Sequence, residues 1–287
     1  MNPIKTIKSN QFWLLGIASG LIAIHVTLTS RQESNIFVWS IIFWIATSFL
    51  VWRKRDTLNL DSSFYATILG LLLVAIILFR SSNYLSLTFI GIAPFVSALA
   101  LSLIASGFKG IKQYKQELIL LFFFNIPHIV ILPLIDISAL TAKFATYMLW
   151  YLGFEASVEG VSVVLPQGSV VVYHGCSGLS NILNLIRLTV MFLILFPLKG
   201  SKQKILVFSA SVVIAFLTNS MRIAVMAILT AAHNQVGFDY WHKGKGSLIF
   251  PIISTAILGI IYYFLLTREN NAATTVTKIQ TQETLDG

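Results

Sequence analysis

The sequence predicts an all-α integral membrane protein with about eight transmembrane helices. Of its 287 residues only 11% are charged and 56% are hydrophobic, and the mean hydropathy is +0.81. A soluble domain carries about 25% charged residues, so this chain has more apolar surface than one globular core can bury. The excess indicates that part of the protein surface faces lipid.

Eight apolar runs are long enough to cross the hydrocarbon core, which takes roughly 17–25 residues as a helix. The runs are 12–29, 36–52, 64–79, 84–106, 118–137, 178–197, 205–230 and 247–266. We interpret the first run as a retained span, because no small-residue cleavage site follows it. Residues 138–153 are shorter, aromatic and contain Lys143. They could form a ninth span, or lie at the membrane interface as an amphipathic helix.

The positive charges favour eight spans with both termini in the cytoplasm. With that topology the cytoplasmic side receives Lys5, Lys8, Arg53, Lys54, Arg55, Lys109, Lys112, Lys115, Lys199, Lys202, Lys204, Arg268 and Lys278. The outer side receives Arg31, Arg80, Lys143, Lys243 and Lys245. Cytoplasmic loops carry the excess of lysine and arginine, and a ninth span would move the cluster at 199–204 outside. We therefore predict a single multi-pass domain over 1–266, in the plasma (inner) membrane, and a disordered cytoplasmic tail over 267–287.

A different pattern precedes the sixth span. Residues 154–176 hold two valine-rich runs around "LPQG", a turn signal of proline plus glycine. They predict a short extracytoplasmic β-hairpin that leads directly into Cys176, the only cysteine. A single cysteine excludes an intramolecular disulfide and a multi-thiolate metal site. The basic residues form no continuous stripe, which argues against nucleic-acid binding.

Cys176 has the surroundings of a nucleophile. It stands at the start of a predicted helix, where free N–H groups and the macrodipole favour an anion such as a thiolate. Gly175 and Gly178 flank this segment and permit close approach of a substrate backbone. Taken alone, the cysteine could equally be a small buried hydrophobe. A cysteine nucleophile also requires a base and a group that stabilises an oxyanion.

Polar side chains form one stripe on the sixth span and another on the seventh. On the sixth span they are Ser177, Ser180, Asn181, Asn184 and Arg187. These five fall within about 120° of one another at 100° per residue. On the seventh, Asn219 and Arg222 are three residues apart and share a face. The asparagines could simply join helices, whereas an arginine in a span costs at least about 2.5–3.5 kcal/mol, which favours a function for Arg222.

Two histidines compete for the role of base near neutral pH. His174 is two residues from Cys176, and His242 lies in "FDYWHKGKGS", between aromatic residues and glycines that would let the loop fold over a site. The residues alone do not choose between them. His25 and His128 lie in apolar spans as possible core residues, and we expect His233 to be a capping or solvated residue.

These motifs, in this order, resemble the exosortase/archaeosortase family. The resemblance covers about 155–250 and is carried by "CSGL" opening a span, "NSMR" near the outer end of the next span, and the histidine-glycine loop before the last. That loop is most similar to the cyanobacterial branch, the cyanoexosortases. The family pattern implies a catalytic core in which Cys176 is the nucleophile, Arg222 the oxyanion or thiolate stabiliser and His242 the acid/base.

We expect Asn219, Asn181, Ser177 and Gly178 to support these three residues. The resemblance gives Arg187 and His174 no role, and it implies no cofactor and no metal.

The function implied is a membrane cysteine protease or transpeptidase with its active site on the outer side. Its partners would be membrane-anchored exported proteins with a C-terminal sorting signal of the PEP-CTERM type, which is a Pro-Glu-Pro box, an apolar span and a basic tail. Cleavage would pass through a thioester, which an acceptor nucleophile of unknown identity resolves. The alternatives are a transporter or polysaccharide-export component, whose polar stripes line a path for an anionic solute, and a membrane acyltransferase that uses histidine on lipids.

Overall fold

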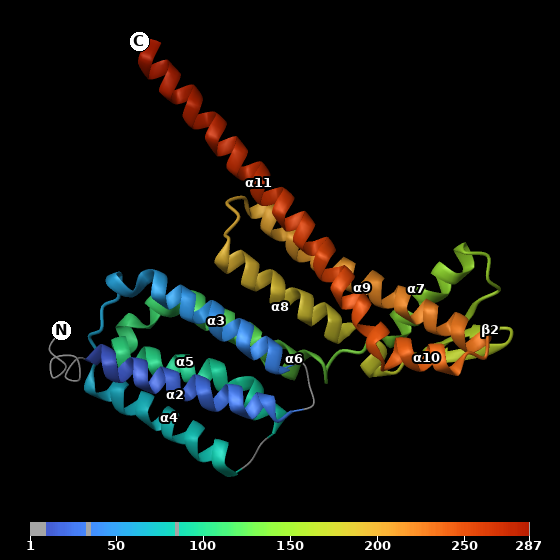
Figure 1. Cartoon of the computed structure of the whole chain (residues 1–287), viewed down its shortest axis with the longest axis horizontal. Coiled ribbons are helices and arrows are strands. Elements are labelled where there is room, and N and C mark those ends of the chain that lie inside the picture. The colour runs from blue at the N-terminus through green and yellow to red at the C-terminus, as the bar shows by residue number, and fades with distance from the viewer. Residues whose placement is uncertain (1–9, 33–35, 84–85, 287) are drawn as a thin grey trace. The chain divides into compact units, whose positions relative to one another are not determined.

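The computed structural model describes residues 10–32, 36–83 and 86–286, with residues 272–286 described by their backbone. The chain is mostly helical and divides into two compact units, Met1–Val130 and Ile131–Gly287 (Figure 1). We call them unit 1 and unit 2 and describe each by itself. The sequence predicts a single domain over residues 1–266, without a boundary near residue 130.

Unit 1 consists of the helices that correspond to the first five predicted spans. They are α2 (Asn10–Ser30), α3 (Ile36–Lys54), α4 (Phe64–Asn83), α5 (Leu87–Gly110) and α6 (Lys115–Ile131), with the short 3₁₀ helices η1 (Arg55–Thr57) and η2 (Ile111–Tyr114). Gly107 has φ +63° and interrupts the end of α5. Glycine adopts this left-handed conformation without steric cost, so the chain can turn there from α5 toward α6.

His25 is a core residue of unit 1. Its Nε2 donates to the carbonyl oxygen of Ile90 at 3.0 Å, and the indole Nε1 of Trp44 donates to its Nδ1 at 3.0 Å. A carbonyl can only accept and an indole N–H can only donate, so this geometry requires a neutral imidazole with its proton on Nε2. Only 3% of His25 is exposed, which confirms the interpretation of this histidine as a satisfied core residue.

Six segments are candidate membrane spans by length and hydropathy. They are Gln11–Ser30, Ile36–Thr57, Phe64–Ser82, Leu87–Ile131, Ser201–Ala231 and Lys245–Asn271. The 45-residue segment Leu87–Ile131 contains two predicted spans, and the apolar helix Leu179–Leu195 is shorter than the six. The multi-pass membrane class is therefore confirmed, whereas the number eight and the side of each terminus stay predictions. Residues 1–9, with Lys5 and Lys8, lie outside the described residues.

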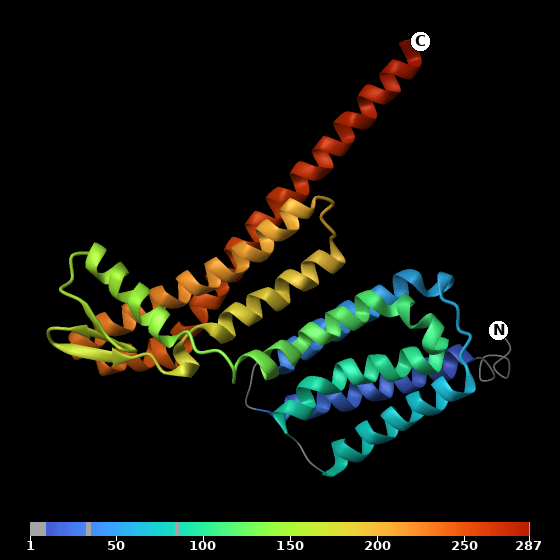
Figure 2. The same ribbon diagram turned by 180° about the vertical axis from the view of Figure 1, so that it is seen from behind.

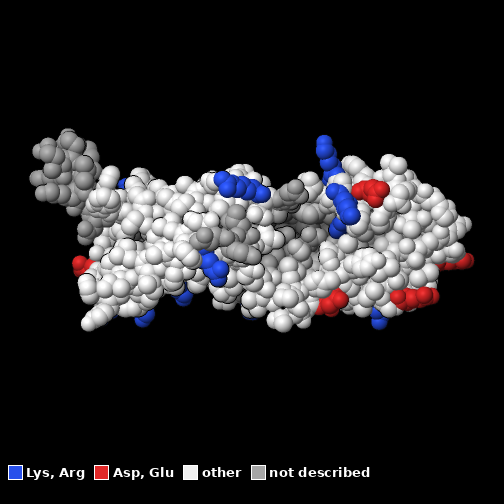
Figure 3. Space-filling model, turned by 90° about the horizontal axis from the view of Figure 1, so that it is seen from below, with Lys and Arg blue, Asp and Glu red and all other residues white. Residues whose placement is uncertain are grey.

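The helices of both units expose large apolar side chains. Leu72 on α4 is 55% exposed and Phe79 is 70% exposed. In unit 2, Ile260 is 69% exposed. Figure 3 shows one face of the molecule on which lysine, arginine, aspartate and glutamate cover only small areas. Such a surface is typical of a protein that faces lipid.

Unit 2 contains the helices α7 (Ser138–Tyr151), α8 (Leu179–Leu195), α9 (Ser201–Ala231), α10 (Gln235–His242) and α11 (Ile249–Asp286), with the 3₁₀ helices η3 (His174–Cys176) and η4 (Lys245–Leu248). The backbone of α11 stays helical to Asp286 and projects beyond the other elements of this unit (Figure 1). The disordered cytoplasmic tail over residues 267–287 stays a prediction.

A three-stranded antiparallel sheet lies between α7 and α8 in the chain, in the order β1-β2-β3. Its strands are β1 (Ser157–Glu159), β2 (Ser162–Leu165) and β3 (Gly168–Val171). Leu165 pairs with Gly168, so Pro166 and Gln167 form the turn. The hairpin predicted from "LPQG" is confirmed. Strand β1 was not predicted, because three residues are too few to show an alternating pattern.

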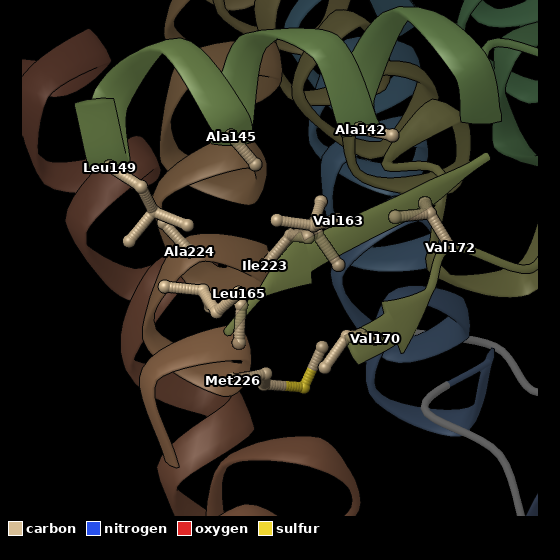
Figure 4. Close-up of a cluster of buried hydrophobic side chains, with 11 residues drawn as sticks. Ala142, Ala145, Leu149, Val163, Leu165, Val170, Val172, Ile223, Ala224 and Met226 are labelled. Carbon is tan, nitrogen blue, oxygen red and sulfur yellow. The ribbon is translucent and has the colours of Figure 1, made fainter. Parts of the chain in front are cut away.

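A hydrophobic core joins one face of the sheet to α7 and α9 (Figure 4). The sheet contributes Val163, Leu165 and Val170, and Val172 follows directly after β3. Helix α7 contributes Ala142, Ala145 and Leu149, and α9 contributes Ile223, Ala224, Met226 and Ala227. The α7 residues follow a spacing of three and four, which places them on one side of the helix. The alanines let the two helices approach closely, and Cys176 packs against this core.

Helix α7 is too short to be a ninth span. Its 14 residues reach about 21 Å at 1.5 Å per residue, less than the roughly 30 Å of hydrocarbon. One side is buried in the core, while Tyr147 and Trp150 are 48% and 62% exposed. The exposed side carries large apolar and aromatic residues, so the amphipathic alternative and a location at the membrane interface stay predictions.

We expect Leu149→Ala to destabilise unit 2 and Leu140→Ala to leave it nearly unchanged. Leu149 is 0% exposed, whereas Leu140 on the same helix is 48% exposed. Removing a fully buried leucine side chain costs about 2–5 kcal/mol. Thermal unfolding of the purified protein in detergent, followed by tryptophan fluorescence, measures the difference. Equal effects of the two substitutions would show that the core between α7 and α9 does not hold the unit.

Candidate functional site

Cys176 lies at the end of a tight turn between β3 and α8. Its backbone N–H donates to the carbonyl oxygen of Tyr173 at 2.8 Å, and the N–H of Ser177 donates to that of His174 at 3.2 Å. The thiol is partly buried against the core. The sequence predicts Cys176 at the N-terminus of a helix, and the structure places it at the end of η3, three residues before α8 begins at Leu179.

Gly178 has a structural role that differs from the one expected. Its φ is +92°, a left-handed conformation that disfavours residues with a Cβ atom. A Cβ atom at this position would also lie 2.6 Å from Nδ2 of Asn219. The glycine therefore permits the turn into α8 and the close approach of Asn219. The expectation that it admits a substrate backbone is not tested by these contacts.

Two buried side chains hold the backbone carbonyls next to the thiol. Asn219 on α9 donates from Nδ2 to the carbonyl oxygen of Cys176 at 3.0 Å, and Thr141 on α7 donates from Oγ1 to that of Ser177 at 2.6 Å. Asn181 on α8 donates from Nδ2 to Oδ1 of Asn219 at 3.2 Å. Side chains of α7 and α9 thus fix the backbone of Cys176 and Ser177, and α8 holds Asn219 in place. The contact between Asn181 and Asn219 joins the polar stripe of the sixth predicted span to that of the seventh.

Thr141 is a site residue that sequence reasoning missed. It is 0% exposed and lies on a helix predicted only as an interfacial segment. The only feature of the sequence that could have indicated it is that Thr141 lies on the same face of the predicted helix 138–153 as the alanines. Ser177, which was predicted, is buried, and its Oγ accepts from the backbone N–H of Leu179 at 3.4 Å. Ser177 therefore helps to start α8.

His242 is brought to Cys176 by the short helix α10. Sequence reasoning treats residues 231–247 as a loop, but His233 turns the chain after α9 with φ +53°. Asn234 then caps α10 by accepting from the N–H of Gly237 at 2.8 Å. Helix α10 ends at His242, whose Nε2 lies 3.6 Å from Sγ of Cys176. The distance is short enough for a hydrogen bond that involves sulfur.

Arg222 holds the end of α10. Its Nη2 donates to the carbonyl oxygen of His242 at 2.7 Å and its Nε donates to that of Trp241 at 3.3 Å. The last carbonyls of a helix have no partner within it, and a cation is favourable at that end of the macrodipole. Arg222 is also close enough to Cys176 for an electrostatic interaction. The geometry adds a positioning role to the charge-stabilising role predicted for this arginine.

The remaining candidates lie elsewhere. His174 is exposed, and its Nε2 donates to the carbonyl oxygen of Ile135 at 3.1 Å. It begins the 3₁₀ helix η3, which ends at Cys176. Arg187 is 4% exposed and donates from Nη2 to Oδ1 of Asn184 at 2.7 Å, further along α8. His233 is exposed at the turn after α9.

The surroundings of His242 favour its neutral form. Partial burial lowers the pKa of this imidazole from its ordinary value, and the positive charges of Arg222 and Lys243 lower it further, whereas Asp239 opposes them. A histidine whose pKa is lowered stays unprotonated to a more acidic pH than usual. At neutral pH its Nε2 can therefore accept a proton from the thiol.

Replacing Thr141 by valine should loosen the turn that carries Cys176. The substitution leaves the buried carbonyl of Ser177 without its donor, a loss of about 1–3 kcal/mol. We expect maleimide to react with Cys176, the only thiol, about threefold faster or more. Thr141→Ser, which keeps the hydroxyl, should restore the slow rate. Thr146→Val is the matched control, since that hydroxyl donates to Ala142 of its own helix; a rate increase as large as that of Thr141→Val would contradict the role of Thr141.

The charges around His242 predict opposite shifts in the pH dependence of Cys176 alkylation. Lys243→Gln removes a positive charge, raises the pKa of His242, and should move the acidic limb of the profile to higher pH. Asp239→Asn removes a negative charge, lowers that pKa, and should move the limb to lower pH. Arg222→Gln should act like Lys243→Gln, with a larger shift. Identical profiles for the lysine and aspartate variants would show that His242 does not control the thiol.

Comparison with known proteins places these residues in a family. The model of the transmembrane exosortase family matches residues 29–259, a range that includes Cys176, Arg222 and His242. No curated protein and no solved structure matches the chain. The match extends over most of both units, well beyond the motifs around the thiol. This chain therefore belongs to the transmembrane exosortase family.

Proposed function

We propose that this chain is a cysteine protease or transpeptidase that cleaves C-terminal sorting signals of the PEP-CTERM type from exported proteins. Membership of the exosortase family indicates a membrane transpeptidase that sorts proteins. The observation that supports the cysteine mechanism is the 3.6 Å contact between Sγ of Cys176 and Nε2 of His242. A thiol and a base within proton-transfer distance are the minimum machinery for nucleophilic catalysis by cysteine.

The first half of the reaction forms an acyl-enzyme. Nε2 of His242 accepts the thiol proton, and the thiolate of Cys176 attacks the carbonyl carbon of the scissile peptide bond. The oxyanion collapses, the C–N bond breaks, and the imidazolium returns its proton to the departing amine. The N-terminal part of the substrate is then held as a thioester on Cys176, while the C-terminal apolar span leaves as a free amine.

The second half consumes the thioester. An acceptor, either an amine or water, loses a proton to Nε2 of His242 and attacks the thioester carbonyl. The C–S bond breaks, the thiolate leaves, and the proton on His242 returns to it. Transfer to an amine conserves the acyl bond, whereas attack by water releases a carboxylic acid.

Arg222 contributes through its position and its charge. Its hydrogen bonds to the carbonyls of Trp241 and His242 keep the imidazole next to the thiol. The guanidinium also interacts electrostatically with Cys176, so it stabilises negative charge that develops there. Asn219 and Thr141 fix the carbonyls of Cys176 and Ser177, in the segment that joins the thiol to α8.

The length of α9 supports a site at the outer surface of the membrane. Its 31 residues reach about 46 Å, some 15 Å more than the hydrocarbon core. With Lys202 and Lys204 at the cytoplasmic interface, as the positive-inside rule favours, the helix emerges near Arg222. A substrate held by its own C-terminal span would present its cleavage site at that level. Assignment to the cyanobacterial branch is part of this proposal.

Cys176→Ala should abolish processing while the protein stays at normal abundance. The test substrate is an exported reporter that ends in a Pro-Glu-Pro box, an apolar span and a basic tail, co-expressed with the chain. The uncleaved reporter should accumulate and is measured by its size on immunoblots. Wild-type processing by Cys176→Ala would contradict the thioester and favour the transporter alternative, which needs no thiol.

The two histidines give a matched comparison in the same assay. His242→Ala should reduce processing about a hundredfold or more, the usual contribution of a positioned general acid–base group. His174→Ala should retain most of the activity, because His174 contacts the carbonyl of Ile135 and not the thiol.

A further inference from the structure

Strand β3 lies at the edge of the sheet, and its register with β2 determines which of its backbone groups point away from the sheet. The N–H of Val172 donates to the carbonyl oxygen of Val161, so these two residues form a hydrogen-bonded pair. In an antiparallel ladder such pairs alternate with pairs that exchange no hydrogen bonds. Val163 with Val170 is then the next bonded pair, while Val171 stands opposite Ser162 without exchanging bonds.

The backbone groups of Ser169 and Val171 therefore point away from β2. The same alternation holds on the other side of β2, where the backbone groups of Ser162 and Val164 face β1. Within the part of the chain that the structure describes, no backbone group accepts from or donates to the outward N–H and C=O groups of Ser169 and Val171. The side chains of both residues are exposed. Two residues of β3 thus offer a complete template for another strand.

This edge runs toward the thiol. From Val171 the chain passes through Tyr173 into η3 and reaches Cys176. The start of β3 packs against the end of α9, where a Cβ atom on Gly168 would lie 3.2 Å from Cα of Ala231. Beyond the end of β3, Sγ of Cys176 in η3 lies 3.6 Å from Nε2 of His242, the last residue of α10. Figures 1 and 2 show the sheet and α10 gathered at the same end of unit 2.

The opposite edge lacks this relation. Strand β1 points only the backbone of Val158 outward, because Ser157 and Glu159 are its bonded pairs with β2. Strand β1 follows α7, and the whole of β2 and β3 separates it from Cys176 in the chain. The asymmetry makes β1 an internal control for β3.

We propose that the free edge of β3 binds an extended peptide segment of the substrate as a fourth strand and delivers the scissile bond to Cys176. This inference rests on the function proposed above. Main-chain hydrogen bonds to Ser169 and Val171 supply binding that depends little on substrate sequence, as in other cases of strand addition. The occupant is a peptide and not a second copy of the chain, because the template leads into the Cys176–His242 pair that acts on a peptide bond.

Val171→Pro tests the template. Proline removes the outward N–H and places its ring at the edge, but it takes no donor from the ladder, so an edge strand tolerates it. We expect cleavage of the reporter to slow about tenfold, the effect of losing one main-chain hydrogen bond and its neighbour. In detergent, with a synthetic peptide that copies the reporter around its cleavage site, KM should rise more than kcat falls. Val158→Pro, the same change on the β1 edge, should cleave at the wild-type rate.

A second measurement uses the wild-type protein and does not depend on how a variant folds. Peptides methylated at one backbone nitrogen at a time, along the segment preceding the cleavage site, should be cleaved slowly when the methyl group is at alternate positions and normally at those between. Strand pairing requires this period of two. A lack of alternation would overturn the proposal.

The outcomes separate this proposal from the proposed function. If Cys176→Ala is inactive and Val171→Pro cleaves like wild type, the strand proposal fails and the cysteine mechanism stands. If both cleave like wild type, the function itself fails. If Val171→Pro cleaves normally but changes the size of the protein in detergent from a dimer to a monomer, the edge pairs with a second copy, which also overturns substrate binding there.

Discussion

The site depends on the guanidinium of Arg222, which caps the C-terminal end of the next helix, α10. Arg222 on α9 binds the last two carbonyls of α10, and α10 carries His242 to within 3.6 Å of Cys176. Helix α10 has eight residues, too few to be stable in isolation. Its position therefore depends on this contact and on the packing of Phe238 and Trp241 against the core.

A second constraint is that the backbone around a nucleophile must still satisfy its own polar groups. The turn at Cys176 interrupts regular structure where side chains crowd together, so the carbonyls of Cys176 and Ser177 require donors. Asn219 and Thr141 supply them from two different helices. Polar residues that resemble helix-joining contacts in the sequence thus also determine where the thiol points. The same hydrogen bonds therefore join the helices and support the site.

Local signals in the sequence predicted much of this arrangement. Hydropathy located the long apolar helices, "LPQG" located the β2–β3 turn, and the spacing of Asn219 and Arg222 placed both on one helix face. The choice between His174 and His242 did not follow from spacing, because it depends on where β3 ends and α10 begins. Helix α10 itself lay hidden in a segment of mixed polarity, and Thr141 has no signature apart from its buried partner.

The two tasks of Arg222 explain why arginine suits this position better than lysine. A planar guanidinium presents several N–H groups in fixed directions, so it can bind the adjacent carbonyls of Trp241 and His242 and still place its delocalised charge near the thiol. An ammonium group is a point charge that can bind either carbonyl but cannot hold both in the same geometry while facing Cys176. The same charge also lowers the pKa of His242. Anchoring, charge stabilisation and tuning of the base thus come from one side chain.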